Sequence, residues 1–241
     1  MYKRQLQDWD LTVTRTAAGV RRNAGLLSKT SVASSLPRVQ RIEVHEGIVA
    51  RILGLYSLTF HNIGDADVRV PGCTAAQVSE LRELGLDGAI GVSALDRRVS
   101  PLAVFEATRN ATVVVSAAAT GLFFAIRWWA LAAFLLIPFV YFYTRRSTRL
   151  SRWGLSGEAI SKRQEFLGRR TNEALMRKVN SVRVRQTMFE RKRGLATIEI
   201  SLAGPMYTGG SISIGMIPLD EAHAVRDRAL YVAETDTRAF M

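Results

Sequence analysis

The sequence predicts two copies of a mainly β domain, each ending in C-terminal helices, with an α-helical transmembrane hairpin between them. Three observations support this fold class: strand-like alternation, an internal repeat, and an apolar run from Ala111 to Thr144. Alternation of apolar and polar residues is typical of half-buried strands. We expect a first domain at 1–95, a juxtamembrane segment and hairpin at 96–149, a second domain at 150–235 and a tail at 236–241.

In the first domain, the pattern predicts six strands. Their expected ranges are Trp9–Arg15, Val20–Leu27, Thr30–Ser34, Val39–His45, Leu55–Asn62 and Asp67–Val70. One or two helical turns are expected from Gly47 to Gly54, because a glycine at the end permits the left-handed backbone of a helix C-terminus. Thr74 is expected to cap the helix that closes the domain. In the fourth strand, alternation places Ile42 and Val44 inward and leaves outward the three polar residues Arg41, Glu43 and His45.

The apolar run predicts a hairpin because of its length. As a single helix it would measure roughly 50 Å, against a hydrocarbon core of about 30 Å. It is interrupted only at Arg127, so we expect two arms at about 111–126 and 128–144, with Arg127, Trp128 and Trp129 as membrane-interface anchors. One long tilted helix is the alternative.

The second half of the chain repeats the first. Residues 39–64 align with 179–204 without a gap, and Arg51, Gly54 and Leu55 match identical residues in the second copy. The second copy has a longer hairpin tip, at Pro205–Gly210. One domain therefore occurs twice.

Both copies contain a basic residue, a strand, a short helical turn ending in Arg-x-x-Gly-Leu, and a strand, at Arg38–Phe60 and Lys178–Ile200. This pattern resembles the bacterial PH-like domain of membrane-flanked proteins, the YdbS and YdbT type. The resemblance implies a bent antiparallel sheet closed by a C-terminal helix, and no known enzymatic activity. With the predicted spans, it implies a multi-pass protein of the bacterial inner membrane with both PH-like domains in the cytoplasm.

The sequence offers no catalytic set. His45, His61 and His223 lack the spacing of a metal motif, and the lone Cys73 excludes an internal disulfide framework and a cysteine-based zinc site. Neither a cofactor nor a metal is predicted.

The net charge of +12 provides the remaining signal. Basic residues are dense after the apolar run, and they favour an anionic phospholipid surface or a protein partner. The candidate contacts are Arg145, Arg146, Arg149, Arg183, Arg185, Arg191, Lys192 and Arg193. Nucleic acid is disfavoured, because no aromatic residues interleave the basic strands.

We therefore predict a membrane-tethered, non-catalytic scaffold that binds protein partners, the anionic membrane surface, or both. The alternative is an accessory subunit of a transport or export assembly, in which Arg127 and Pro138 would serve a conduction path. The sequence leaves the identity of the partner and the oligomeric state open.

Overall fold

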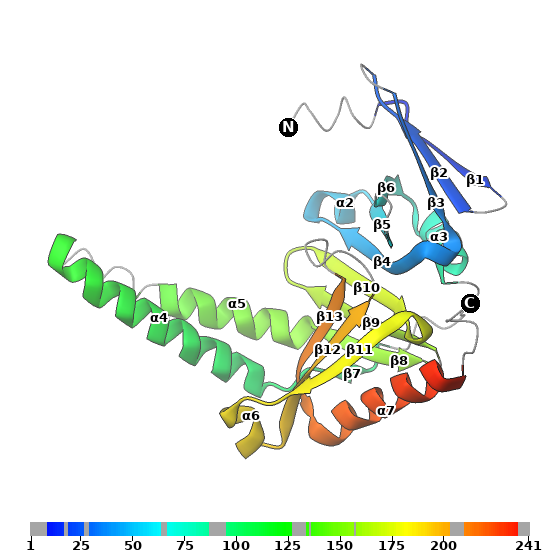
Figure 1. The fold of residues 1–241 in the computed structure, drawn as a ribbon. Helices are drawn as coiled ribbons and strands as arrows, with labels where there is room; N and C mark the ends of the chain where they lie inside the picture. Colours follow the sequence, from blue (N-terminus) through cyan, green and yellow to red (C-terminus); the bar gives the residue numbers. More distant parts are fainter. Residues whose placement is uncertain are drawn as a thin grey trace.

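The computed structural model describes residues 9–16, 19–26, 29–63, 67–86, 95–126, 134, 136–156, 158–202 and 210–235. The first unit consists of strands followed by a closing helix (Figure 1). Its elements are β1 (Thr12–Thr16), β2 (Gly19–Ala24), β3 (Thr30–Ser35), the 3-10 turn η1 (Leu36–Arg38), β4 (Val39–Glu46), α2 (Ile48–Ile52), β5 (Tyr56–Asn62), β6 (Val68–Cys73) and α3 (Ala75–Gly85).

The second unit has the same order of elements. They are β8 (Arg152–Ser156), β9 (Ala159–Glu165), β10 (Arg169–Leu175), η3 (Met176–Lys178), β11 (Val179–Arg185), α6 (Met188–Lys192), β12 (Leu195–Leu202), β13 (Ser211–Pro218) and α7 (Leu219–Thr235). The short strand β7 (Arg97–Arg98) and the helices α4 (Leu102–Ile126) and α5 (Leu136–Leu150) connect the units. The structure thus shows the repeat that the alignment predicts.

Local sequence explains the matching turns. Gly54 and Gly194 leave α2 and α6 with φ of 65° and 64°, a left-handed conformation that only glycine adopts readily. Thr74 caps α3 through a capping box with Gln77, and Thr187 does the same for α6 with Glu190. The predicted cap at Thr74 is confirmed. β6 continues through Cys73, beyond the predicted end at Val70.

One sheet joins the two units. Its strand order is β6-β5-β4-β10-β9-β8-β7, and β4 pairs antiparallel with β10, with His45 opposite Arg170 and Glu43 opposite Asn172. The sheets β1-β2-β3 and β11-β12-β13 are separate. The strands β4, β5 and β6 of the first unit therefore continue directly into β10, β9 and β8 of the second. We call the β4·β10 pairing the junction.

The junction explains one wrong prediction about side-chain direction. Arg41 was expected to face outward, but the residue is buried, at 7% exposed, because β4 is an inner strand of the joined sheet. Its guanidinium lies 3.4 Å from the carbonyl of Ser211 and 3.8 Å from Glu43. Burial lowers the pKa of Arg41 below its usual value. Ile42 is fully buried, as predicted.

Ion pairs cross the junction on both faces of the sheet. The Arg170 Nε donates to Glu43 at 3.0 Å, and Arg51 reaches Glu165 at 2.9 Å.

Two further side chains bind across the junction. Arg82 of α3 binds Glu173 of β10 through two guanidinium nitrogens. The Lys178 Nζ donates to the carbonyls of Pro37, at 3.2 Å, and of Val39. These contacts hold the two units in one orientation.

Acid should weaken the junction. The hydrogen bond from His61 lowers the pKa of Glu43 despite its partial burial, and Arg170 adds to the effect. Because the folded pKa lies below the ordinary 4.5, the stabilisation is complete above that pH and is lost as the pH falls through the folded value. We expect the stability difference between the wild type and Glu43→Gln, measured by urea unfolding, to shrink from about pH 6 to about pH 3. A difference that grows on acidification would contradict this assignment.

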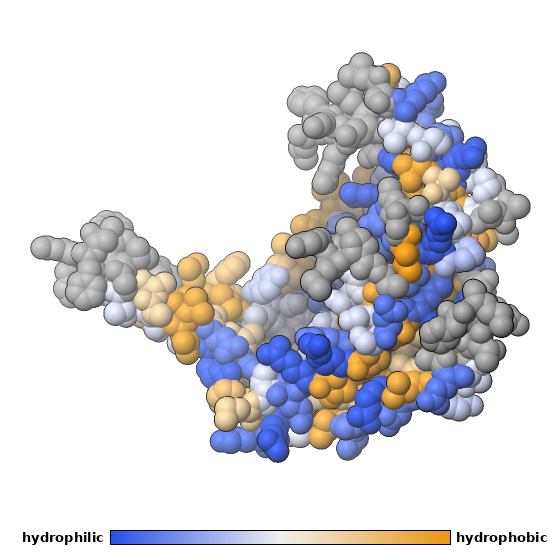
Figure 2. Space-filling model, in the orientation of Figure 1, coloured by the Kyte–Doolittle hydropathy of each residue, from blue (hydrophilic) through white to orange (hydrophobic). Residues whose placement is uncertain are grey.

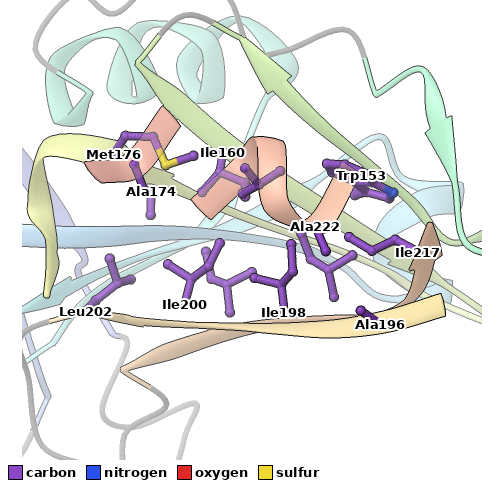
Figure 3. Close-up of a cluster of buried hydrophobic side chains, with 14 of the residues drawn as sticks. Trp153, Ile160, Ala174, Met176, Ala196, Ile198, Ile200, Leu202, Ile217 and Ala222 are labelled. Atoms are coloured by element: carbon purple, nitrogen blue, oxygen red, sulfur yellow. The ribbon is translucent and has the colours of Figure 1, made fainter. Parts of the chain in front are cut away.

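Each unit has its own core. In the second unit, aliphatic side chains of β12 and β13 pack against α7, and Trp153 and Ile160 close the cluster from the joined sheet (Figure 3). The first core, around Ile42, Leu58 and Phe60, also includes two residues of the second unit, Ala159 and Leu175. Burial of these apolar side chains stabilises each unit and the contact between them.

The predicted transmembrane hairpin is wrong. α4 and α5 run side by side and project from the second unit (Figure 1), but within the described residues no helix combines the length and apolar character that a membrane crossing requires. α5 has 15 residues, about 22 Å at 1.5 Å per residue. Its second half carries three arginines, Arg145, Arg146 and Arg149. The proposed anchors Arg127, Trp128 and Trp129 lie outside the described residues.

The predicted location and the membrane part of the fold class depended on those spans. The multi-pass placement in the bacterial inner membrane, on which the cytoplasmic placement of both domains rested, is therefore wrong as well. The fold class that the structure shows is mainly β, with a few helices.

Candidate functional site

Three of the predicted basic residues lie on the last turns of α5. Arg145, Arg146 and Arg149 are all exposed. Two of them, Arg145 and Arg149, line a cavity of about 730 Å³ where α5 meets the start of α4. The other residues lining this cavity are Arg98, Val99, Pro101, Val104, Tyr141 and Thr148. We call this cavity the hairpin-base cavity.

The cavity brings cations together from elements far apart in sequence. Arg98 belongs to β7, which pairs with β8, whereas Arg145 and Arg149 lie on α5, beyond the whole of α4. The Arg145 Nη1 donates to the Tyr141 hydroxyl at 3.2 Å, and its guanidinium lies 5.8 Å from the centre of that ring. Tyr141 therefore orients one of the three cations.

A second cavity, of about 400 Å³, adjoins the first on α5. It is lined by Phe142, Arg145, Arg146, Arg149 and Leu150. No acidic residue is among the described residues that line either cavity. Guanidinium groups bind phosphate oxygens through two parallel hydrogen bonds, so this arrangement suits a phosphate-bearing ligand.

Exposed apolar side chains continue from the cavities along α4 and α5. Phe139 and Phe142 are each 66% exposed, and Val113 and Val114 on α4 are similarly open. Figure 2 shows this apolar surface along the projecting helices, with hydrophilic residues where they join the domain. The surface is therefore cationic at the base of α4 and α5 and apolar beyond it.

The basic residues of α6 lie on the other side of the first turns of α4. The Arg193 guanidinium lies 5.1 Å from the ring centre of Phe105, and Arg109 lies 3.6 Å from that of Phe189. These cation–π contacts hold α6 against α4. Arg191 and Lys192 remain exposed on α6. The structure therefore places the α5 and α6 groups on two sides of one helix.

Arg183 and Arg185 lie apart from these cavities. Both are exposed on β11, as the alternation with Val182 and Val184 predicts. Glu199 of β12 lies directly opposite Arg183, and Thr197 lies opposite Arg185. They belong to a sheet edge, and neither lines the hairpin-base cavity.

Sequence reasoning missed Arg98 and Tyr141 as members of the site. Arg98 was noticeable only as a basic residue before the apolar run, and Tyr141 lies within that run. A helical hairpin returns the chain to its starting point, so basic residues that flank such a run meet in space. That rule would have identified Arg98.

His61 contributes to the fold. His61 Nδ1 lies 2.8 Å from Asp67 Oδ2, and His61 Nε2 lies 3.6 Å from Glu43. Among the described residues, no three His, Cys, Asp or Glu side chains are grouped so as to hold a metal ion. Glu173 and Glu190 are the most deeply buried carboxylates described, and each has a partner: Arg82 for Glu173, and the Thr197 hydroxyl for Glu190.

Comparison with known proteins identifies the family. No curated protein and no solved structure matches the chain. The family model described as the bacterial PH domain matches residues 5–88 and 101–232. PH-like domains of this kind indicate a binding or scaffold role and are generally non-catalytic. Because these matches cover most of both units, the chain belongs to the bacterial PH domain family.

Proposed function

We propose that this chain is a non-catalytic binding protein whose hairpin-base cavity and α5 arginines bind an anionic phospholipid surface. One observation carries the proposal: three guanidinium groups from β7 and α5 line one cavity, beside a strip of exposed aromatic and aliphatic side chains. Phospholipids combine phosphate with an apolar region. The site offers a counterpart to each.

Electrostatics and apolar contact favour the same ligand. Near an anionic surface each basic residue contributes about 1 kcal/mol, and the contribution falls off within a Debye length. Exposed Phe139 and Phe142 add apolar area at the same edge of α5. A free phosphate would use only the cationic part of the site.

The exposed α6 residues form a second basic patch, on the other side of α4. Arg191 and Lys192 lie next to Arg193, which is anchored on Phe105 of α4. The rest of the two joined units would then be available to a protein partner, which is the scaffold part of the proposal.

The test is flotation of the full chain with phosphatidylcholine vesicles, with and without phosphatidylglycerol, at low and at physiological salt. We expect binding that requires the anionic lipid and weakens with salt, since exposed charges are screened. Inorganic phosphate at the headgroup concentration should not displace the chain, because a surface engages several sites at once. Displacement by phosphate would identify a free phosphate compound as the ligand. Equal or absent binding to both vesicles at low salt would contradict lipid binding.

A further inference from the structure

The junction uses one edge of β4 and one edge of β10. Each of these strands has a counterpart in the other unit. In the alignment of the two copies, β3 corresponds to β10 and β11 corresponds to β4. In the joined sheet, β10 and β4 pair with each other. β3 and β11 are the outermost strands of their own sheets, and among the described residues no strand pairs with their free edges.

Burial differs at several positions between these two edges and their counterparts at the junction. Ile42 of β4 is fully buried, whereas its counterpart Val182 in β11 is only partly buried. In β10 the residues from Glu173 to Leu175 are buried, whereas Ala33 in β3 is exposed. Val182 and Ala33 are thus more exposed than their counterparts at the junction, whereas Ser34 of β3 is buried, like its counterpart Ala174, and donates to Asn62. An open strand edge presents unpaired backbone N–H and C=O groups to another strand.

We propose that β11 of one copy pairs with β3 of a second copy, and that this head-to-tail contact repeats the junction between molecules. Transferring the junction register through the alignment of the two copies places Thr30 opposite Arg185, Val32 opposite Arg183 and Ser34 opposite Ser181. The contact is heterologous, so it propagates into rings or filaments. The inference is independent of the lipid-binding proposal, since it uses a different edge of the molecule.

The side chains make the contact between molecules weaker than the junction. At the junction Arg170 pairs with Glu43, but Thr30 and Arg183 occupy the corresponding positions at the ends. The two edges thus place Thr30 and Val32 against arginines, with no like charges directly opposed. Backbone hydrogen bonds then provide most of the contact, as in strand addition. We infer reversible, concentration-dependent assembly.

Cysteine cross-linking tests the register. In a Cys73→Ala background, full chains carrying Thr30→Cys are mixed with full chains carrying Arg185→Cys; both sites are exposed. Facing residues have Cβ atoms about 4.5–5.5 Å apart, close to disulfide distance. Asn180→Cys on the same strand is the matched control, displaced by roughly 16 Å. We expect the Thr30/Arg185 mixture to form disulfide dimers at least about tenfold faster than the Thr30/Asn180 mixture.

Two further variants serve as controls for this test. Arg170→Cys with His45→Cys in one chain reproduces the same pair at the junction and should close within the molecule. If that pair closes and the two mixtures react at equal rates, the proposal is overturned. Rapid dimerisation of Arg185→Cys chains alone would also overturn it, because that result requires β11 to pair with β11.

Charge substitutions provide an independent test of the pairing between β3 and β11. Thr30→Arg should lower the mass-average size of the assembly, because it faces Arg185 and lies diagonal to Arg183. Adding Arg183→Glu recreates between molecules the Arg170–Glu43 pair of the junction, and should restore or enlarge the assembly. Light scattering of the full chain over a range of concentrations measures this. A monomer at every concentration, for wild type and double variant alike, would overturn the proposal.

Discussion

Replacing Glu173 with alanine is expected to lower the free energy of unfolding by about 3 kcal/mol, since removing one partner of a buried ion pair leaves the other uncompensated. Glu173 is 1% exposed on β10 and accepts from the Nε of Arg82 on α3 at 2.8 Å. The side chain of Arg82 keeps 21% exposure, which places the expected loss at the lower end for such pairs. Urea unfolding measures the change.

A double-mutant cycle separates the pair from its surroundings. Arg82→Ala/Glu173→Ala should be more stable than the sum of the two single changes predicts, because neither charge is then left alone. Glu234→Ala, at an exposed position on α7, is the control and should change stability by less than about 0.5 kcal/mol. Additive single changes would show that the two side chains do not stabilise the contact between the units together.

Reversing two charges at the hairpin-base cavity should nearly abolish binding to anionic vesicles. Arg145→Glu/Arg149→Glu removes two attractive charges and adds two repulsive ones, so at about 1 kcal/mol each the loss approaches 4 kcal/mol. That corresponds to roughly a thousandfold weaker binding. Vesicle flotation at low salt measures the effect.

The control variant must change the net charge by the same amount as Arg145→Glu/Arg149→Glu does. Arg69→Glu/Arg228→Glu makes the same change at exposed positions on β6 and α7, away from both cavities. It should weaken binding by less than about tenfold, through the long-range field alone. Equal losses in the two double variants would mean that net charge, not the cavity, determines binding.

The repeat explains why the strands were predictable. Alternation in two aligned copies marks the same strands twice, and the glycines at 54 and 194 mark the same turn. What the sequence does not contain is the partner of each strand edge. β4 and β11 have similar patterns, yet β4 is an inner strand and β11 an edge, because only β4 meets β10. Arg41 is buried for this nonlocal reason.

The apolar run was misjudged because hydropathy ignores where helices begin and end. α4 starts at Leu102, well before the run, and includes Glu106 and Arg109. α5 continues to Leu150, so that it carries Arg145, Arg146 and Arg149 within the helix. Arg109 is therefore part of α4, and the three arginines after the run are part of α5. The same error concealed the hairpin-base cavity, whose residues lie at both ends of the run.

The most direct test of lipid binding is to locate the residues that touch the lipid. An environment-sensitive fluorophore on Phe142→Cys, in a Cys73→Ala background, reports from the second cavity on α5. The account predicts a blue shift with vesicles containing phosphatidylglycerol, none with phosphatidylcholine alone, and none from the same label on Arg69→Cys. A shift at position 69 with none at position 142 would contradict the account.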